Sequence, residues 1–326
     1  MMKQPYIFRV TIIVVVFCLN SAFAAKEEQK SNIEHIVIGE GSGRFTMTSA
    51  AGPLEKPIEV FFHKPKQFHS QSPILIVIPG AGRNGDDYRD SWVQASEQHG
   101  VLILSPSYSE DGFDFSQYHL GGIVKNFQVK GGIKSSISVY RLQDSDITWD
   151  LNNNPEDWIF QDFDIIFKTA KLAVQSSVEK YDLFGHSAGG QILHRFALFN
   201  GPSKADRILA SNSGFYTQVD LETSPIFGLK GLLGDNLGLD QVFHKNLVVF
   251  LGELDNEKET RGTTLHTPTV DRHGLGRFAR GNYFYNEAQE LALKLGLEFQ
   301  WSMETILDTG HDYRLMGEAA ARYLYE

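Results

Sequence analysis

The chain has 326 residues, of which 42% are hydrophobic and 21% charged, the balance of a globular protein rather than a disordered or fibrous one. Its 40 Asp and Glu outnumber its 30 Lys and Arg, and the resulting formal charge of −10 disfavours nucleic acid and anionic lipid surfaces as partners. A single cysteine also excludes the small domains that depend on disulfides.

The N-terminal residues have the pattern of an export signal. Residues 1–9 carry two cations and no acid, an apolar run follows at residues 10–19, and Ala22-Phe23-Ala24 has the small-x-small form of a cleavage site. The apolar run is about half of the ~20 residues that span a bilayer. We therefore predict a signal peptide at residues 1–24 and a secreted or periplasmic mature protein with no stable membrane anchor.

The rest of the chain alternates strand patterns with helical patterns. Two antiparallel strands are expected early in the mature chain, at residues 34–38 and 58–62. Continuous apolar or strand-like runs follow at residues 74–78, 101–104, 181–184, 247–251 and 300–307. Helical patterns occupy residues 91–99, 162–176, 188–199, 283–295 and 315–325.

This alternation indicates an α/β fold. Continuous apolar strands are typical of a parallel sheet covered on both faces, and the intervening helices supply its right-handed crossovers. No internal repeat or low-complexity linker divides the chain. We predict a mostly parallel central sheet with helices on both faces, in one domain at residues 25–326, with a lid or specificity insertion at residues 214–244.

The segment Gly185-His186-Ser187-Ala188-Gly189 matches G-x-S-x-G between a predicted strand and a predicted helix. In that context the motif forms a sharp turn that exposes the serine, and its two glycines are needed where the backbone is crowded. The helix that follows presents its N-terminal amides and positive dipole end to a developing oxyanion. We predict Ser187 as a nucleophile and the Ala188 amide as one oxyanion donor.

A glycine-rich segment, residues 79–85, follows the strand at residues 74–78 and has two interpretations. Its glycines match G-x-G-x-x-G, but the next strand ends in Ser105-Pro106-Ser107 and lacks the acid that a dinucleotide site requires. The other interpretation is a loop that supplies the second oxyanion donor. We favour this loop, with the Ala81 amide as donor and Gly82 as the next choice.

A serine nucleophile needs a base and an orienting acid, which in this type of fold follow in the order Ser, Asp or Glu, His. Asp255 lies just after the strand at residues 247–251, and His311 lies in a late loop before the last helix. We predict Asp255 as the acid and His311 as the base. The other candidates are Glu253, Asp235 and Asp240 for the acid and His273 for the base.

Together these motifs resemble the α/β-hydrolase family over residues 74–326. Three further segments, residues 185–197, 212–217 and 277–285, look like those of bacterial exported hydrolases described as poly(3-hydroxybutyrate)-depolymerase-like. The resemblance implies a serine esterase that cleaves a small or polymeric carboxylic ester and needs no cofactor and no metal. A serine peptidase or amidase on the same scaffold is the alternative, followed by a non-catalytic binding protein.

Overall fold

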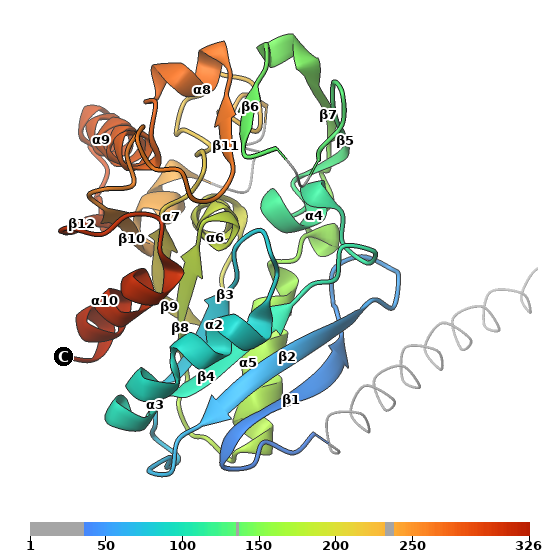
Figure 1. The fold of residues 1–326 in the computed structure, drawn as a ribbon, viewed down its shortest axis with the longest axis vertical. Coiled ribbons are helices and arrows are strands. Elements are labelled where there is room, and N and C mark those ends of the chain that lie inside the picture. The colour runs from blue at the N-terminus through green and yellow to red at the C-terminus, as the bar shows by residue number, and fades with distance from the viewer. Residues whose placement is uncertain (1–35, 135–136, 232–237) are drawn as a thin grey trace, which may run out of the picture.

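A large mixed sheet forms the centre of the molecule (Figure 1). The computed structural model describes residues 36–134, 137–231 and 238–326, and in that part of the chain the sheet has eight strands in the order β1-β2-β4-β3-β8-β9-β10-β12. They are β1 (Gly41–Thr48), β2 (Pro57–Lys64), β3 (Ile74–Ile78), β4 (Leu102–Ser107), β8 (Tyr181–His186), β9 (Ala205–Ser211), β10 (Asn246–Gly252) and β12 (Ser302–Ile306). β2 is antiparallel to both of its neighbours, and the strands from β4 to β12 are parallel. The predicted mostly parallel sheet is confirmed.

Burial follows the apolar patterns, with one strand displaced from its predicted position. All five residues of β3 and all six of β8 are buried. The strand expected at residues 34–38 instead begins at Gly41, and its predicted first two residues fall outside the described ones. The glycines of β1 resemble a turn in the sequence, but Gly43 lies under the Phe62 ring of β2, where an added Cβ would approach Phe62 Cζ to 2.4 Å.

Helices cover both faces of the sheet, as predicted. One face packs against α5 (Gln161–Ala173), α6 (Ala188–Phe199) and α9 (Arg277–Leu295) through Ile74, Ile76 and Ile78 of β3. The other face packs against α2 (Gly85–Ser91), α3 (Val93–His99) and α10 (Tyr313–Tyr325), with Leu75 and Val77 in that core. Because alternate β3 side chains enter different cores, the continuous apolar run is explained.

Two insertions extend beyond the carboxyl ends of the parallel strands, at the top of Figure 1. The first lies between β4 and α5 and contains α4 (Phe115–His119), β5 (Val124–Val129), β6 (Val139–Arg141), the short 3₁₀ turns Asp144–Asp146 and Pro155–Asp157, and β7 (Ile147–Leu151). The second, which we call the acid loop (residues 253–276), contains β11 (Thr264–His266) and α8 (Pro268–Arg272). β6 and β11 pair in parallel, so the two insertions are joined. The sequence patterns did not predict these elements.

Two predicted segments fall partly or wholly outside the described residues. Of residues 214–244, those described include α7 (Leu239–Phe243) and a buried stretch at 215–219, and their role as a lid stays a prediction. The signal peptide predicted at residues 1–24 is not described. In the described ranges, no helix has the length and apolar character to cross a membrane.

Candidate active site

Ser187 occupies a strained turn between β8 and α6. Its backbone has φ 60° and ψ −113°, a conformation that is rare for a residue other than glycine. An added Cβ at Gly185 would lie 2.5 Å from Gly189 O, and one at Gly189 would lie 2.2 Å from Ile78 O. The predicted need for both glycines is therefore confirmed, because each permits a close backbone approach. The turn leaves the Ser187 side chain partly exposed.

Ser187, His311 and Asp255 form one chain of hydrogen bonds. His311 Nε2 lies 3.1 Å from Ser187 Oγ, and His311 Nδ1 lies 2.6 Å from Asp255 Oδ2. A carboxylate accepts hydrogen bonds and donates none, so Nδ1 carries the proton and Nε2 is free to accept from the serine hydroxyl. The Asp255 side chain is fully buried and His311 is largely buried. The structure thus brings the three predicted residues together.

The topology explains this convergence. Asp255 follows β10 and His311 lies between β12 and α10, so both come from the same edge of the sheet as Ser187. The competing residues that are described have other contacts: Glu253 Oε2 accepts from the Asp308 amide at 3.2 Å, Asp240 lies in α7, and the His273 ring stacks on Tyr283. Asp235 lies outside the described residues.

Burial favours the neutral form of the His311 imidazole. Desolvation lowers the His311 pKa, the hydrogen bond that His311 donates to Asp255 opposes that shift, and the nearby Arg277 guanidinium adds to it. Burial also lowers the pKa of His186, whose ring centroid lies 4.5 Å from that of His311. A neutral imidazole at neutral pH is the protonation state that a general base requires.

The glycine-rich loop after β3 lies beside the serine. An added Cβ at Gly80 would lie 3.5 Å from Ser187 Cβ, and the loop is held by a 2.8 Å hydrogen bond from Tyr118 Oη to Pro79 O. Ala81 is exposed in this loop, and Ala188 is the first residue of α6. In the described part of the chain, neither amide donates a hydrogen bond. Both amides thus lack a competing acceptor there, and their role as oxyanion donors stays a prediction.

Sequence reasoning missed a buried asparagine that links the acid and base segments. Asn212 follows β9, has φ 45°, and receives a 2.8 Å hydrogen bond from the Gly252 amide on Oδ1. Its Nδ2 donates to Gly310 O at 3.3 Å, one residue before His311. A polar residue directly after a buried strand was the available signal, although its partners depend on the tertiary fold.

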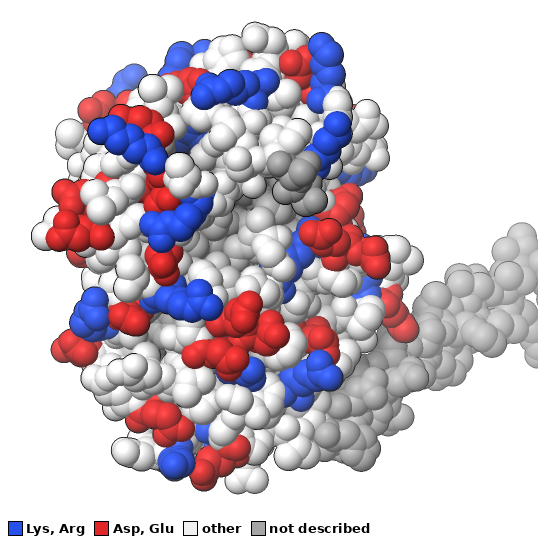
Figure 2. All heavy atoms as spheres, viewed as in Figure 1, with Lys and Arg blue, Asp and Glu red and all other residues white. Residues whose placement is uncertain are grey.

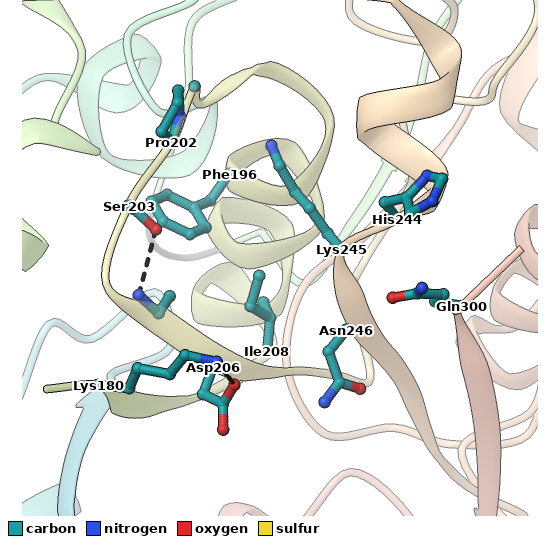
Figure 3. Close-up of a pocket in the computed structure, with 12 residues that line it drawn as sticks. Lys180, Phe196, Pro202, Ser203, Asp206, Ile208, His244, Lys245, Asn246 and Gln300 are labelled. Atoms are coloured by element: carbon teal, nitrogen blue, oxygen red, sulfur yellow. Dashed lines mark hydrogen bonds and ion pairs between the residues drawn. The ribbon is translucent and has the colours of Figure 1, made fainter. Parts of the chain in front are cut away.

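Figure 2 shows a hollow in the surface in front of α6, between β11 and α4, with both basic and acidic side chains around it. A separate pocket of about 580 Å³ lies at the opposite, amino edge of the sheet (Figure 3). Residues that line this pocket include Lys180, Ser203, Lys245 and Asn246.

Among the described residues, no group of three His, Cys, Asp or Glu side chains is arranged to hold a metal.

Solved structures resemble this fold over most of its length. Poly(aspartic acid) hydrolase-1 from Sphingomonas sp. KT-1 is 30% identical, with a TM-score of 0.75 over 89% of this chain and 100% of that one. LpqC, a poly(3-hydroxybutyrate) depolymerase from Bordetella parapertussis, is 24% identical, with a TM-score of 0.72 over 88% of this chain and 91% of that one, and supports the fold alone. No family model and no curated protein matches the sequence. The 30% identical relative, together with the fold, shows that the chain belongs to the α/β-hydrolase family.

Proposed function

We propose that this protein is an exported serine hydrolase that cleaves carboxylic esters through an acyl-enzyme on Ser187. The observation that carries the proposal is the hydrogen-bonded chain from Ser187 Oγ through His311 to the buried Asp255 carboxylate. A nucleophile, a base and an orienting acid in this geometry are the parts needed for acyl transfer. Membership of the α/β-hydrolase family supports the same reaction class.

Each group has a role in the proposed reaction. Ser187 Oγ attacks the acyl carbon while His311 Nε2 takes its proton, and Asp255 stabilises the imidazolium that forms. The Ala81 and Ala188 amides bind the oxyanion, aided by the positive end of the α6 dipole. His311 then protonates the leaving alcohol, and water activated by the same imidazole releases the acid and regenerates Ser187.

A second candidate is hydrolysis of amide bonds in an anionic polymer. The 30% identical relative is named for poly(aspartic acid), a polyamide with carboxylate side chains. On this chain, Lys and Arg side chains lie at the margin of the hollow in Figure 2 together with Asp and Glu side chains, and the whole chain carries a charge of −10. Local cations attract an anionic substrate even where the net charge is negative.

One set of assays tests both candidates on the mature protein, residues 25–326. A fluorophosphonate probe should label wild type at Ser187, as located by peptide mass spectrometry, and should not label Ser187→Ala. p-Nitrophenyl esters of graded acyl length and poly(aspartic acid) are then compared as substrates, with polymer cleavage followed by size-exclusion chromatography. Ester turnover without polymer cleavage supports the first candidate, and salt-sensitive polymer cleavage supports the second. A folded wild-type protein that neither reacts with the probe nor turns over either substrate would exclude both and leave the binding-protein alternative.

A further inference from the structure

Arg277 forms a buried ion pair with the acid of the proposed triad. Its Nη1 donates to Asp255 Oδ1 at 2.8 Å, and its Nη2 donates to the carbonyls of Arg261 and Thr263 at 3.2 and 3.1 Å. The side chains of Arg277 and Asp255 are only 1% and 0% exposed. The two ends of the guanidinium fork therefore hold the carboxylate and the acid loop at the same time.

The position of Arg277 is locally unfavourable. It is the first residue of α9, where the positive end of the helix dipole repels a cation. Burial adds a desolvation cost, and in the described part of the chain its Nε has no hydrogen-bond partner. A buried cation at a helix N-terminus requires a compensating interaction, and the ion pair with the Asp255 carboxylate provides it.

The Asp255 carboxylate accepts hydrogen bonds from both the Arg277 guanidinium and the His311 imidazole. Arg277 holds Oδ1 while His311 holds Oδ2, and these are the side-chain partners of Asp255 within the described residues. Gly262 closes over this pair, because an added Cβ there would lie 2.8 Å from His311 Nε2 and 2.9 Å from Arg277 Nη2. We propose, on the basis of the proposed function, that Arg277 is a positioning residue that fixes the Asp255 carboxylate against His311 and offsets part of its negative charge.

A second buried charge acts on His311 in the opposite direction. Glu259 Oε2 accepts from the His311 amide at 2.8 Å, and Arg261 holds Glu259 ionised by pairing with it at 2.7 Å. Glu259 raises the His311 pKa, whereas Arg277 lowers it. The titratable and charged groups around His311 are Asp255, Glu259 and Arg261 from the acid loop, Arg277 from α9, His186 from β8 and Asp312 beside it in the chain.

The test compares Arg277→Met with the matched variant Arg277→Lys in ester hydrolysis. Methionine removes the charge and the fork, so kcat should fall roughly 100-fold with little change in KM, because the triad loses its alignment. In a plot of kcat/KM against pH, the fall in activity on the acidic side (the acid limb) should move to higher pH. Without the Arg277 charge the His311 imidazolium is no longer repelled, so the His311 pKa rises. Lysine keeps the charge but cannot reach all three acceptors, so it should lower kcat and leave the limb at its wild-type position. Glu259→Gln should move the limb to lower pH.

NMR titration of the His311 imidazole gives a readout that does not require turnover. In a Ser187→Ala background, the His311 pKa should rise with Arg277→Met, stay close to its starting value with Arg277→Lys, and fall with Glu259→Gln. A folded Arg277→Met with wild-type kcat and an unmoved His311 titration would overturn the inference while leaving Ser187 labelling intact. If Arg277→Met does not fold, Arg277→Lys decides, because wild-type kcat in that variant would show that the fork is not needed. If the fluorophosphonate probe does not label the wild-type protein, the proposed function itself is rejected.

Discussion

The two edges of the parallel sheet differ in how their polar groups are used. At the carboxyl edge, strained residues such as Ser187 and Asn212 follow adjacent strands, and the partly exposed Ser187 forms a hydrogen bond with His311. At the amino edge, the pocket in Figure 3 has ample volume, but Lys180 pairs with Asp206 at 2.7 Å and Lys245 Nζ donates to Ala197 O at 2.8 Å. The comparison teaches that convergent reactive groups mark a site better than cavity volume does.

The largest expected effect comes from a comparison of two serines, Ser187 at the carboxyl edge and Ser203 at the amino edge. Ser187→Ala should lower kcat for ester hydrolysis by more than about 10⁴-fold, because the nucleophile is lost. Ser203→Ala removes the matched hydroxyl from the amino-edge pocket, where Ser203 Oγ accepts from the Ala205 amide, and should leave kcat unchanged. Steady-state kinetics of both variants, with melting curves to confirm folding, checks the pair. A comparable loss in Ser203→Ala would break the comparison.

A smaller loss is expected at Asn212. Asn212→Gly preserves the positive φ but removes the side chain that links Gly252 to Gly310, so the acid and base segments lose their connection. We expect kcat to fall roughly 10-fold to 100-fold, with KM close to wild type, because the triad is misaligned rather than removed.

Asn246→Ala is the matched control at the other edge, since Asn246 lines the amino-edge pocket. It should retain wild-type kcat. If Asn212→Gly lowers the melting temperature but keeps wild-type kcat, Asn212 serves stability alone and the carboxyl edge is less coupled than we infer.

The smallest effect on turnover is expected at Asp162, a buried acid that lies outside the hydrogen-bonded triad. Asp162 accepts from Ser49 Oγ at 2.8 Å and from the Ala50 amide, yet burial raises its pKa to about 6. A raised pKa in the folded state contributes stability that is full below the unfolded value near 4 and is lost as pH rises through 6. The loss is on the order of 2–3 kcal/mol.

Asp162→Asn removes this titration. Its melting temperature relative to wild type should therefore be higher at pH 7 than at pH 4.5, while kcat stays unchanged. A difference in melting temperature that does not vary with pH would contradict the assignment. If kcat is also unchanged in Asp162→Asn, a buried acid outside the hydrogen-bonded triad has no catalytic role. Burial and charge alone would then not mark a catalytic residue.

The residues that the sequence predicted well are those whose positions follow from local patterns. Ser187, Asp255 and His311 each lie just beyond a strand pattern, and parallel strands bring such positions to one edge. Arg277 and Glu259 could not be assigned roles in this way, because their partners come from other segments and depend on side-chain packing. The helical pattern predicted at residues 283–295 also began after Arg277, and the acid loop that carries Glu259 was not predicted.

The small sheets above the site were also beyond prediction. β6 and β11 have three residues each, which is too short for an apolar period, and they come from segments more than a hundred residues apart. Their pairing depends on the tertiary fold, which brings the two segments together.

The pairing of β6 with β11 limits how the loops above the proposed active site can be redesigned. Thr264 N donates to Ser138 O at 2.8 Å and Leu142 N donates to His266 O at 2.9 Å, so the insertion after β4 and the acid loop share one hydrogen-bonded seam. Asp144 reinforces the seam by accepting from Thr269 Oγ1 at 2.9 Å. The two insertions therefore form one hydrogen-bonded unit, and a graft that exchanges either of them alone leaves backbone groups without partners.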